Sequence, residues 1–591
     1  MSRKRSGLRK SMVVVGVLAL VVPLLLAWAA PVSAATITVC ASVCDYTTIQ
    51  DAVDAAGGGD VINIYPGTYN ESVDLGGHSG ALTLRTVNNA GNPTPGTATV
   101  NGGTDPAFYT SSQHDGNITI DGFIANSDDS DGIDVAVYSN IVIRNVTASN
   151  TGDDGINVEA DGDVTIRDCT ASNNDSDGIY VGDAEDITIS DCIANGNHDE
   201  NIDVNMADGN VTITGCTANG STDGEGIEVT DVDGNLNIST STANGNDGDG
   251  IEIEDVGGNV TITDCTADGN SSDGIEIADV GGNVTITDCT ADGNDIDGFC
   301  VNLEVESVAA LPEGESEESE LDDDELDEST GVHQSVRPSA DGGDVTIANC
   351  TAIGNVDAGF DAYGMLGTLT IQACIAMDNE NGVELDGMGE ASGVLVNGNI
   401  ICGNDCGIID PVPQLNAEGN WWGCPGGPEA AGCDPICQID SIDVDFTPWI
   451  SRITSGASPD PVTIGEPAVV SFQFRGGPPA VYLGEGPGDL RGPAPFTVST
   501  DNGTLNGNGA TVEEFINAAN GNLQVTLVPD AVGTATVTVS GPCGLSDLEG
   551  ATAVVGVVAA AEFVPEPGTV LLLGSGLMGL AGYAGLRLRK R

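Results

Sequence analysis

Short segments of alternating apolar and polar residues recur through the middle of the chain. Residues 259–263 read Asn-Val-Thr-Ile-Thr, and residues 250–253 read Gly-Ile-Glu-Ile. Alternation with a period of two predicts short β-strands with one buried face, and the Gly, Asp and Asn residues between them predict tight turns. No helical periodicity accompanies these segments, so they predict strands alone.

The strand segments form a cassette that returns at a nearly constant interval. Its isoleucines Ile133, Ile156, Ile179 and Ile202 are 23 residues apart, and the next three steps are 25, 24 and 24 residues. Such a period is typical of a solenoid in which each repeat forms one coil. A coil of this length fits three short strands and three bends, and parallel strands of adjacent coils lie about 4.8 Å apart. The repeats therefore predict an all-β, single-stranded parallel β-helix.

Stacked coils place equivalent residues above one another, which predicts two internal columns. Cysteines that share one cassette position predict an inward column of packed thiols, with occasional disulfides between neighbours as the alternative. Asparagines five residues further on predict a ladder of hydrogen-bonded amides at a bend. The cysteines are Cys169, Cys192, Cys216, Cys265, Cys289, Cys350 and Cys374, with Ser241 at the missing step, and the asparagines are Asn174, Asn197, Asn246, Asn270, Asn294, Asn355 and Asn379.

The chain divides into predicted segments that flank and interrupt this solenoid. Residues 1–35 combine a basic start, an apolar stretch and small residues at the end, which predicts a secretory signal peptide; an uncleaved membrane anchor is the alternative. The β-helix is expected over residues 36–450, and its acidic insertion at 302–341 is expected to be disordered. Residues 451–562 alternate as strands between Gly/Pro turns, which predicts a small antiparallel Ig-like β-sandwich that serves as a spacer. A carbohydrate-binding module is the alternative for that segment.

The last segment, residues 563–591, carries a sorting pattern. Pro565, Glu566 and Pro567 precede an apolar run at 569–586 and a cluster of basic residues. The run is just long enough for a transmembrane helix, and its basic end should remain cytoplasmic. These three ordered parts closely resemble a PEP-CTERM sorting tail. The resemblance implies export across the inner membrane, recognition by an exosortase-type membrane protease, and a final place at the cell surface or in the extracellular matrix; a plain anchor is the alternative.

The charge of the chain restricts its partners. The net charge is −74, and the 16 basic residues include only seven arginines and no lysine between residues 36 and 563. Such a surface repels nucleic acid and anionic lipid, which excludes both as partners. Such a charge is compatible with a habitat of high salt, with binding of divalent cations, or with a simple role in keeping the protein soluble. Cysteines outside the repeat, in an exported chain, predict disulfides at the two ends of the solenoid: Cys40, Cys44, Cys402, Cys406, Cys424, Cys433 and Cys437.

Both ends of the solenoid resemble a known superfamily. Residues 46–56 can form a short amphipathic helix, and they precede the strand-like segment 59–64 and the sequence Gly-Thr-Tyr-Asn-Glu at 67–71. This order resembles the first coil of pectate-lyase-like right-handed β-helices, and Gly-Asn-Trp-Trp-Gly at 419–423 resembles the closing coil of secreted bacterial members. Residues 67–71 also match one pectin-methylesterase fragment, although the other catalytic segments of that family are absent. The resemblance implies a right-handed β-helix and leaves the activity open, because the superfamily hosts many chemistries.

Acidic residues form two predicted columns on the solenoid. The residue after each cassette isoleucine points outward, and a second column lies one residue before the cassette glycine. Like charges about 4.8 Å apart repel by roughly 1 kcal/mol per pair even in water, and oxygen ligands suit Ca²⁺. Ordinary turn chemistry with salt screening is the alternative to a calcium site. The candidate ligands are Glu228, Glu252 and Glu276 in the first column and Asp249, Asp273 and Asp297 in the second.

Polysaccharide cleavage is the enzyme hypothesis. The resemblance to pectate lyases implies Ca²⁺-binding aspartates beside a catalytic arginine. Arg144 and Arg167 fall one coil apart near Asp168 and Asp191, so these four residues are the catalytic candidates. An enzyme should interrupt its repeat around one cleft, however, and these cassettes stay regular over many coils. We therefore expect a non-catalytic surface or matrix protein that binds or organises extracellular polysaccharide or acts as an adhesin, with a Ca²⁺-dependent polysaccharide lyase as the alternative.

Overall fold

The computed structural model describes residues 34–559, with gaps at 78–79, 304–342, 365–366, 386–392, 410–411, 413–414, 425, 429, 438–443, 448, 477–495, 515–521, 542, 544–547 and 549. The chain separates into two compact units, Met1–Thr447 and Pro448–Arg591. The predicted signal peptide, acidic insertion and transmembrane helix fall almost wholly outside the described residues. Within the described part, no helix has the length and apolar character needed to cross a bilayer.

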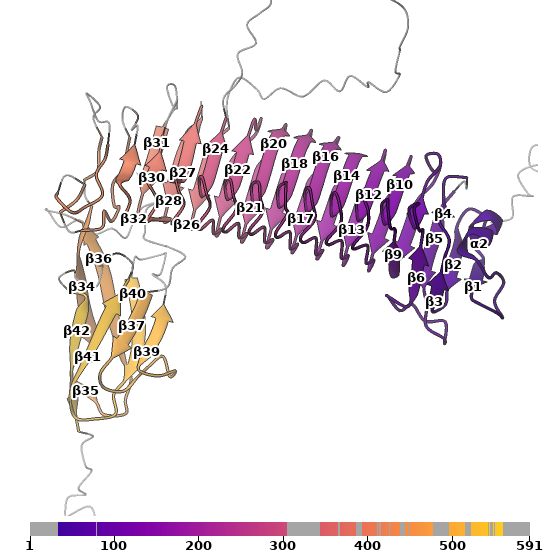
Figure 1. Ribbon diagram of the computed structural model, residues 1–591. Coiled ribbons are helices and arrows are strands. Elements are labelled where there is room, and N and C mark those ends of the chain that lie inside the picture. Colours follow the sequence, from indigo (N-terminus) through magenta and orange to yellow (C-terminus); the bar gives the residue numbers. More distant parts are fainter. Residues whose placement is uncertain are drawn as a thin grey trace, which may run out of the picture. The chain divides into compact units, whose positions relative to one another are not determined.

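The N-terminal unit is a parallel β-helix, as the repeats predict (Figure 1). Its longest sheet, sheet 1, contains the second strand of each cassette. The strands of sheet 1 are β1 (Thr36–Val39), β2 (Asp60–Ile64), β5 (Leu82–Thr86), β8 (Ile118–Asp121), β11 (Ile141–Arg144), β13 (Val164–Arg167), β15 (Ile187–Ser190), β17 (Val211–Thr214), β19 (Leu236–Ser239), β21 (Val260–Thr263), β23 (Val284–Thr287), β25 (Val345–Ala348), β28 (Thr368–Gln372) and β31 (Gly393–Asn397).

Sheet 2 contains the first strand of each cassette, which begins at the cassette isoleucine. Its strands are β4 (Val73–Asp74), β7 (Phe108–Tyr109), β10 (Ile133–Val137), β12 (Ile156–Ala160), β14 (Ile179–Ala184), β16 (Ile202–Ala207), β18 (Ile227–Val232), β20 (Ile251–Val256), β22 (Ile275–Ala278), β24 (Phe299–Asn302), β27 (Ala358–Tyr363), β30 (Asn381–Glu384) and β33 (Cys406–Ile409).

A third face is fully stranded only near the two ends of the solenoid. There it forms one three-stranded sheet of β3 (Gly67–Tyr69), β6 (Ala98–Asn101) and β9 (Phe123–Asn126), and another of β26 (Thr351–Ile353), β29 (Ile375–Met377) and β32 (Ile400–Cys402). In the coils between them, adjacent coils pair through single bridges such as Thr170 with Ile193. The expectation of three strands in every coil is therefore wrong for the central coils, where a short Cys-Thr-Ala segment runs between two bends.

The register is that of stacked, equal-length coils. Val260 of β21 pairs with Val284 of β23, and Ile262 pairs with Ile286. All four side chains are buried, while the intervening threonines are partly exposed. Alternation along each strand thus puts an apolar file inside the coil and a polar file outside, which is why the sequence period encodes this fold.

Both predicted internal columns are present. The seven cassette cysteines are free and buried, so the thiols pack as a column without disulfides between them. In the amide ladder, the Asn270 backbone N–H donates to Asn294 Oδ1 at 2.9 Å, and the bonds continue beyond the predicted set to Asn404. At the coil where Ser221 replaces the asparagine, Asn201 enters the ladder and donates to Asn246 Oδ1.

The ends of the β-helix are closed as predicted. Helix α2 (Ile49–Ala55) is capped by Thr48, whose hydroxyl accepts the Asp51 backbone N–H, and its apolar side packs inward. Trp421 and Trp422 are buried at the other end, in the segment that resembles a closing coil. Disulfides join Cys40 to Cys44 at the start, and Cys406 to Cys437 and Cys424 to Cys433 near the end.

The C-terminal unit consists of two β-sheets whose strands are mostly antiparallel. Strands separated by turns are present in this segment, as its alternating pattern predicts. One sheet has the order β34 (Ile450–Ser458), β36 (Ala468–Gly476), β40 (Asn522–Val528), β38 (Thr504–Leu505), and the other β35 (Val462–Thr463), β42 (Thr552–Val558), β41 (Gly533–Ser540), β37 (Phe496–Thr500), β39 (Thr511–Glu514).

Candidate functional site

The first predicted acidic column is present on the outer side of sheet 2. In consecutive strands Asp203 pairs with Glu228, Glu228 with Glu252, and Glu252 with Glu276. These side chains alternate with buried isoleucines and valines, so they leave the core and stack along the solenoid. Because parallel pairing repeats every coil, one outward carboxylate per coil is enough to build a continuous acidic file.

The second column lies in the turn before each strand of sheet 2, and its carboxylates are buried. Asp249, Asp273 and Asp297 are 5%, 6% and 7% exposed. One oxygen of each accepts a backbone N–H from the next coil: Asp273 Oδ1 accepts from Asp297 at 2.6 Å, and Asp297 Oδ1 accepts from Ala358 at 2.6 Å. Hydrogen bonding to the turn backbone therefore accounts for one oxygen of each carboxylate. The second oxygen takes no part in this ladder of backbone hydrogen bonds.

The two columns lie close enough together to form shared acidic clusters. Carboxylate oxygens of Asp177, Glu200 and Asp203 all lie within 4.8 Å of one another, and those of Glu200, Glu225 and Glu228 do so as well. The second column thus includes Glu200 and Glu225, which the sequence pattern missed because glutamate replaces aspartate in these two coils. The spacing of the repeat could have identified them, because both glutamates occupy the position before the cassette strand that aspartate holds in the other coils.

Burial and mutual repulsion make these carboxyl groups weak acids. Burial, reinforced by Glu228 and Glu200, raises the pKa of Asp203 to about 8. Burial, reinforced by Asp249 and Glu225, raises the pKa of Glu252 to about 8. Cations between the columns would offset both the burial of the carboxylates and the repulsion between them. The ligands in these coils are all oxygen atoms, which suits Ca²⁺. Calcium binding by Glu228, Glu252, Glu276, Asp249, Asp273 and Asp297 remains a prediction.

The arginine candidates lie on sheet 1, away from the acidic columns of sheet 2. Arg144 of β11 and Arg167 of β13 are register partners, so they stack one coil apart as predicted. Arg144 forms an ion pair with Asp121 at 2.9 Å, and Arg167 forms one with Asp168 at 3.0 Å. Asp191 lies in the bend after β15, with φ of 52°.

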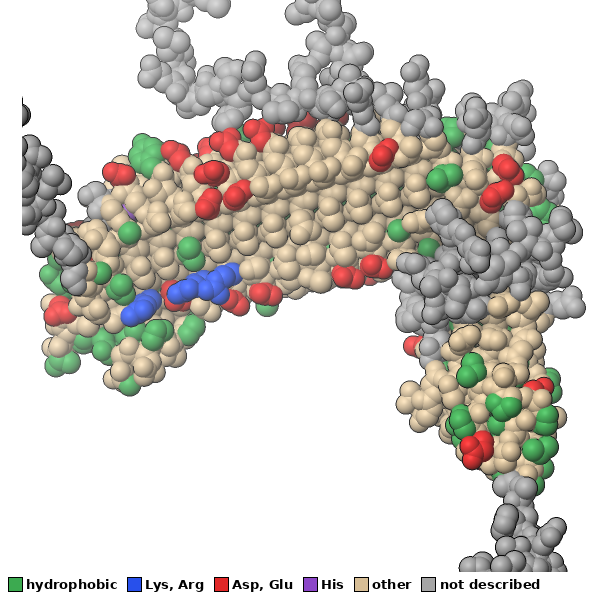
Figure 2. Space-filling view, turned by 180° about the vertical axis from the view of Figure 1, so that it is seen from behind, with side chains coloured by type: hydrophobic (Ala, Val, Ile, Leu, Met, Phe, Trp, Pro, Cys, Tyr) green, Lys and Arg blue, Asp and Glu red, His purple; other side chains and the backbone are tan. Residues whose placement is uncertain are grey.

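These ion pairs define one short basic patch. Arg85, Asp121, Arg144 and Arg167 are successive register partners in sheet 1. The blue patch in Figure 2 consists of these three arginines. The chain therefore places its guanidinium groups beside single aspartates, whereas the clustered carboxylates belong to another sheet. Asp121 is the member of this patch that sequence reasoning missed, because its coil lies outside the regular cassettes.

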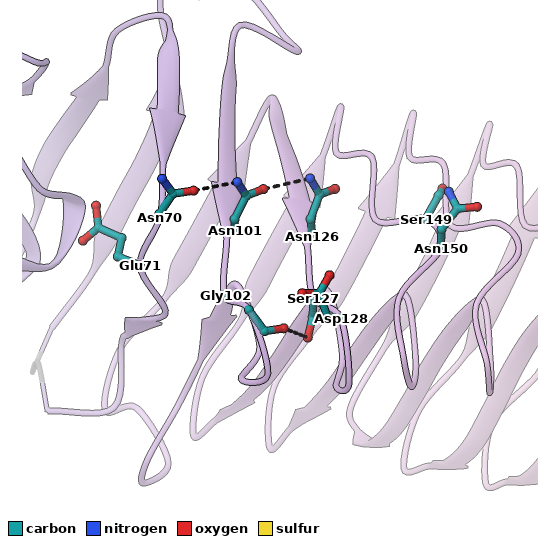
Figure 3. Close-up of a pocket in the computed structure, with 10 residues that line it drawn as sticks. Asn70, Glu71, Asn101, Gly102, Asn126, Ser127, Asp128, Ser149 and Asn150 are labelled. Carbon is teal, nitrogen blue, oxygen red and sulfur yellow. Dashed lines mark hydrogen bonds between the residues drawn. The ribbon is translucent and has the colours of Figure 1, made fainter.

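A polar groove crosses the third face at the N-terminal coils (Figure 3). It has a volume of about 710 Å³. Asparagine side chains span it as a ladder: Asn101 Nδ2 donates to Asn70 Oδ1 at 2.8 Å, and Asn126 Nδ2 donates to Asn101 Oδ1 at 3.0 Å. The remaining lining residues are Glu71, Gly102, Gly103, Ser127, Asp128, Ser149 and Asn150. Every side chain that lines the groove is polar.

Glycines and a fixed glutamate set the shape of this groove. A Cβ on Gly102 would lie 2.0 Å from the Asp105 carbonyl oxygen, so only glycine fits that bend. The Glu71 carboxylate accepts the backbone N–H groups of Ile49 and Gln50 at 2.8 and 3.0 Å. Glu71 thus pairs two N–H groups of the first turn of α2, and these bonds fix its own position in the lining of the groove. The fragment at 67–71 stands out in the sequence, but the groove arises only when coils stack and bring together Asn70, Asn101 and Asn126, which are 31 and 25 residues apart.

Family comparisons identify the class of fold and the C-terminal segment. A model of right-handed β-helix regions matches residues 97–239 and 154–306, and the PEP-CTERM protein-sorting motif matches residues 563–590. The chain therefore contains a right-handed β-helix region. It carries a PEP-CTERM sorting motif that includes Pro565, Glu566 and Pro567, and this motif implies export with a membrane-anchored tail. No curated protein matches the sequence.

Solved structures with a similar chain path include three carbohydrate-active proteins. Pectate lyase Pel9A is 15% identical with a TM-score of 0.30, over 62% of this chain and 80% of that chain. A point mutant of the periplasmic alginate epimerase AlgG is 13% identical with a TM-score of 0.32, over 58% and 82%. The A-module of mannuronan C-5 epimerase AlgE6 from Azotobacter vinelandii is 16% identical with a TM-score of 0.32, over 63% and 92%. The activities in these titles are those of the named proteins.

Proposed function

We propose that this exported protein is a non-catalytic β-helix of the cell surface or extracellular matrix that binds or organises extracellular polysaccharide. The observation that carries the proposal is the groove on the third face, whose lining is polar throughout and includes the Asn70–Asn101–Asn126 ladder. Amides at a fixed spacing can exchange paired hydrogen bonds with successive sugar hydroxyls. Export through the PEP-CTERM pathway, with an exosortase-type protease as processing partner, would bring the groove to the outside of the cell.

Charge favours an uncharged polysaccharide as the ligand. Asp128 is exposed in the groove, and the lining of the groove contains no arginine, lysine or histidine. A polyanion would therefore meet repulsion from the groove and from a chain of net charge −74. The lining also lacks aromatic side chains that could stack on sugar rings. Affinity should therefore come from many weak hydrogen bonds along a long chain, which suits a matrix protein that holds polymer strands.

A glycan array with the purified full chain tests the proposal, with binding of neutral glucans and mannans as the expected result. The variant Asn101→Ala should weaken binding at least about tenfold, because it removes the middle of the ladder and two of its hydrogen bonds. Asn235→Ala is the matched control, since Asn235 occupies a similar exposed ladder with Asn210 and Asn259 outside the groove. Equal binding by wild type and Asn101→Ala, or no binding to any neutral glycan, would exclude the groove as the site.

A Ca²⁺-dependent polysaccharide lyase is the second candidate, favoured by the paired Arg144 and Arg167 beside Asp121 and Asp168. Incubation of the same full chain with acidic polysaccharides and Ca²⁺ would release unsaturated products if the chain is a lyase, and Arg144→Ala or Arg167→Ala would abolish them. We expect no products, because the clustered carboxylates that could hold Ca²⁺ lie on sheet 2, whereas both arginines lie on sheet 1.

A further inference from the structure

Cys300 differs from every other free cysteine that the structure describes. The seven column thiols each approach a backbone carbonyl oxygen, as Cys265 does with Thr263 at 3.4 Å and Cys289 with Thr287 at 3.2 Å. Cys300 is 6% exposed and is in no disulfide, and its thiol makes no hydrogen bond within the described residues. It lies in β24 of sheet 2, in the file of outward carboxylates, between Glu276 and Asp361. A thiol thus occupies a position where the neighbouring coils carry acids.

The Cys300 thiol lies against buried carboxylates from both acidic columns. Its sulfur and carboxylate oxygens of Asp273 and Asp297 all lie within 4.8 Å of one another, and all three side chains are buried. On the next coil, Asp361 Oδ1 is buried without a hydrogen-bond partner. Buried polar atoms are normally paired, so an unpaired thiol and an unpaired carboxylate oxygen in adjacent coils indicate a missing ligand that carries positive charge.

The geometry points to a zinc-type divalent cation site formed by Asp273, Asp297 and Cys300, with Glu276 or Asp361 as the neighbouring carboxylate that completes it. A tetrahedral Zn²⁺ ion with bonds of about 2.0 Å to oxygen and 2.3 Å to sulfur requires ligand atoms about 3.5 Å apart. The ligand atoms now lie within 4.8 Å of one another, so they would have to approach by up to about 1.3 Å. Side-chain rotation within one coil can supply such a movement.

Backbone hydrogen bonds already orient two of the three ligands. Asp273 Oδ1 is held by the Asp297 backbone N–H and Asp297 Oδ1 by the Ala358 backbone N–H, both at 2.6 Å. These bonds hold one oxygen of each carboxylate and leave the second oxygen for the metal. Hydrogen bonds of this kind to ligating groups are typical of built metal sites.

The sulfur ligand separates this site from the other acidic clusters. Thiolate is a soft ligand that favours zinc and related transition metals, whereas Ca²⁺ takes oxygen ligands. Burial, with the negative charges of Asp273 and Asp361, raises the pKa of Cys300, so the thiol stays protonated without metal. Binding of the cation therefore forms a metal–sulfur bond and releases the thiol proton to solvent, and affinity should increase as the pH rises.

Titration of the EDTA-treated full chain with Co²⁺ tests the site. We expect a thiolate-to-cobalt charge-transfer absorption at one ion per chain, removed by Zn²⁺ and retained in a hundredfold excess of Ca²⁺. Cys300→Ser should abolish this absorption and lower the Zn²⁺ affinity at least about tenfold. Cys265→Ser is the matched control, because Cys265 is an equally buried free thiol outside the acidic cluster, and it should leave the absorption unchanged.

A second variant keeps the test informative if Cys300→Ser does not fold. Asp297→Asn retains an oxygen acceptor for the Ala358 N–H, removes one charge from the cluster, and should weaken Zn²⁺ binding about tenfold. The inference is overturned if the wild type gives no charge-transfer absorption, if Cys300→Ser retains it, or if Ca²⁺ displaces the ion at equal concentration. Glycan binding is measured separately, so failure of this site and failure of the proposed function are distinguishable.

Discussion

Replacement of Asn270 by alanine is expected to lower the free energy of unfolding of the β-helix by about 3 kcal/mol. Asn270 is 1% exposed and lies in the middle of the amide ladder. Its Oδ1 accepts from both the backbone N–H and Nδ2 of Asn246, each at 3.0 Å, and its Nδ2 donates to Asn294 Oδ1 at 3.1 Å. Alanine leaves two buried donors of Asn246 without a partner, and each unpaired buried donor costs about 1–3 kcal/mol.

Asn235→Ala provides the comparison for this variant. Asn235 makes an equivalent set of bonds, accepting from the backbone N–H and Nδ2 of Asn259 at 3.0 Å each, but it is exposed. Water can replace the lost amide there, so we expect a loss of less than about 0.5 kcal/mol. Urea denaturation followed by circular dichroism measures both variants. Equal losses would mean that burial of the ladder does not determine its contribution.

The metal-free protein is expected to become less stable as the pH rises from 5 to 8. Burial, with nearby acids, raises the pKa of Asp131, Asp203, Glu252 and Asp297 to about 8 each. In the unfolded chain such groups titrate near 4, so between these values the folded state binds more protons than the unfolded state. The stabilisation is fully present below about pH 4 and is lost as the pH rises through about 8.

The size of this effect follows from the number of protons retained. One carboxyl group that stays protonated only in the folded state changes the free energy of unfolding by about 1.4 kcal/mol per pH unit. Screening by salt reduces the total change in the free energy of unfolding from all carboxyl groups of the two columns. We expect the melting temperature in EDTA to fall by at least about 5 °C between pH 5 and pH 8. Differential scanning calorimetry at constant ionic strength is the measurement.

Cations and a double variant distinguish the columns from other acidic groups. Millimolar Ca²⁺ should flatten the pH dependence, because the ions replace the protons between the carboxylates. Asp203→Asn combined with Glu252→Gln should also reduce it, whereas Asp247→Asn, at an exposed position outside both columns, should leave it unchanged. A melting temperature that rises from pH 5 to pH 8 in EDTA would contradict the explanation.

The fold could be predicted from the sequence in unusual detail, because the repeat couples local pattern to long-range contact. A spacing of 23 to 25 residues between isoleucines decides which residues pair in adjacent coils, and Ile251 indeed pairs with Ile275. The thiol column, the amide ladder and the first acidic file follow from that one rule. The central coils departed from it on the third face, where adjacent coils pair through one bridge each instead of a full strand.

By itself, the sequence determined the parallel β-helix, its two internal columns and the sorting motif, because each depends on a periodic or local pattern, whereas the right hand of the helix was implied by the resemblance to pectate-lyase-like proteins. Only the tertiary structure decided that Arg144 and Arg167 lie on a different sheet from the clustered carboxylates. It also placed Cys300 among Asp273 and Asp297 and assembled the groove around Asn101. These arrangements join residues from different columns and irregular coils, so they depend on bend geometry and side-chain burial that the spacing of residues along the chain does not encode.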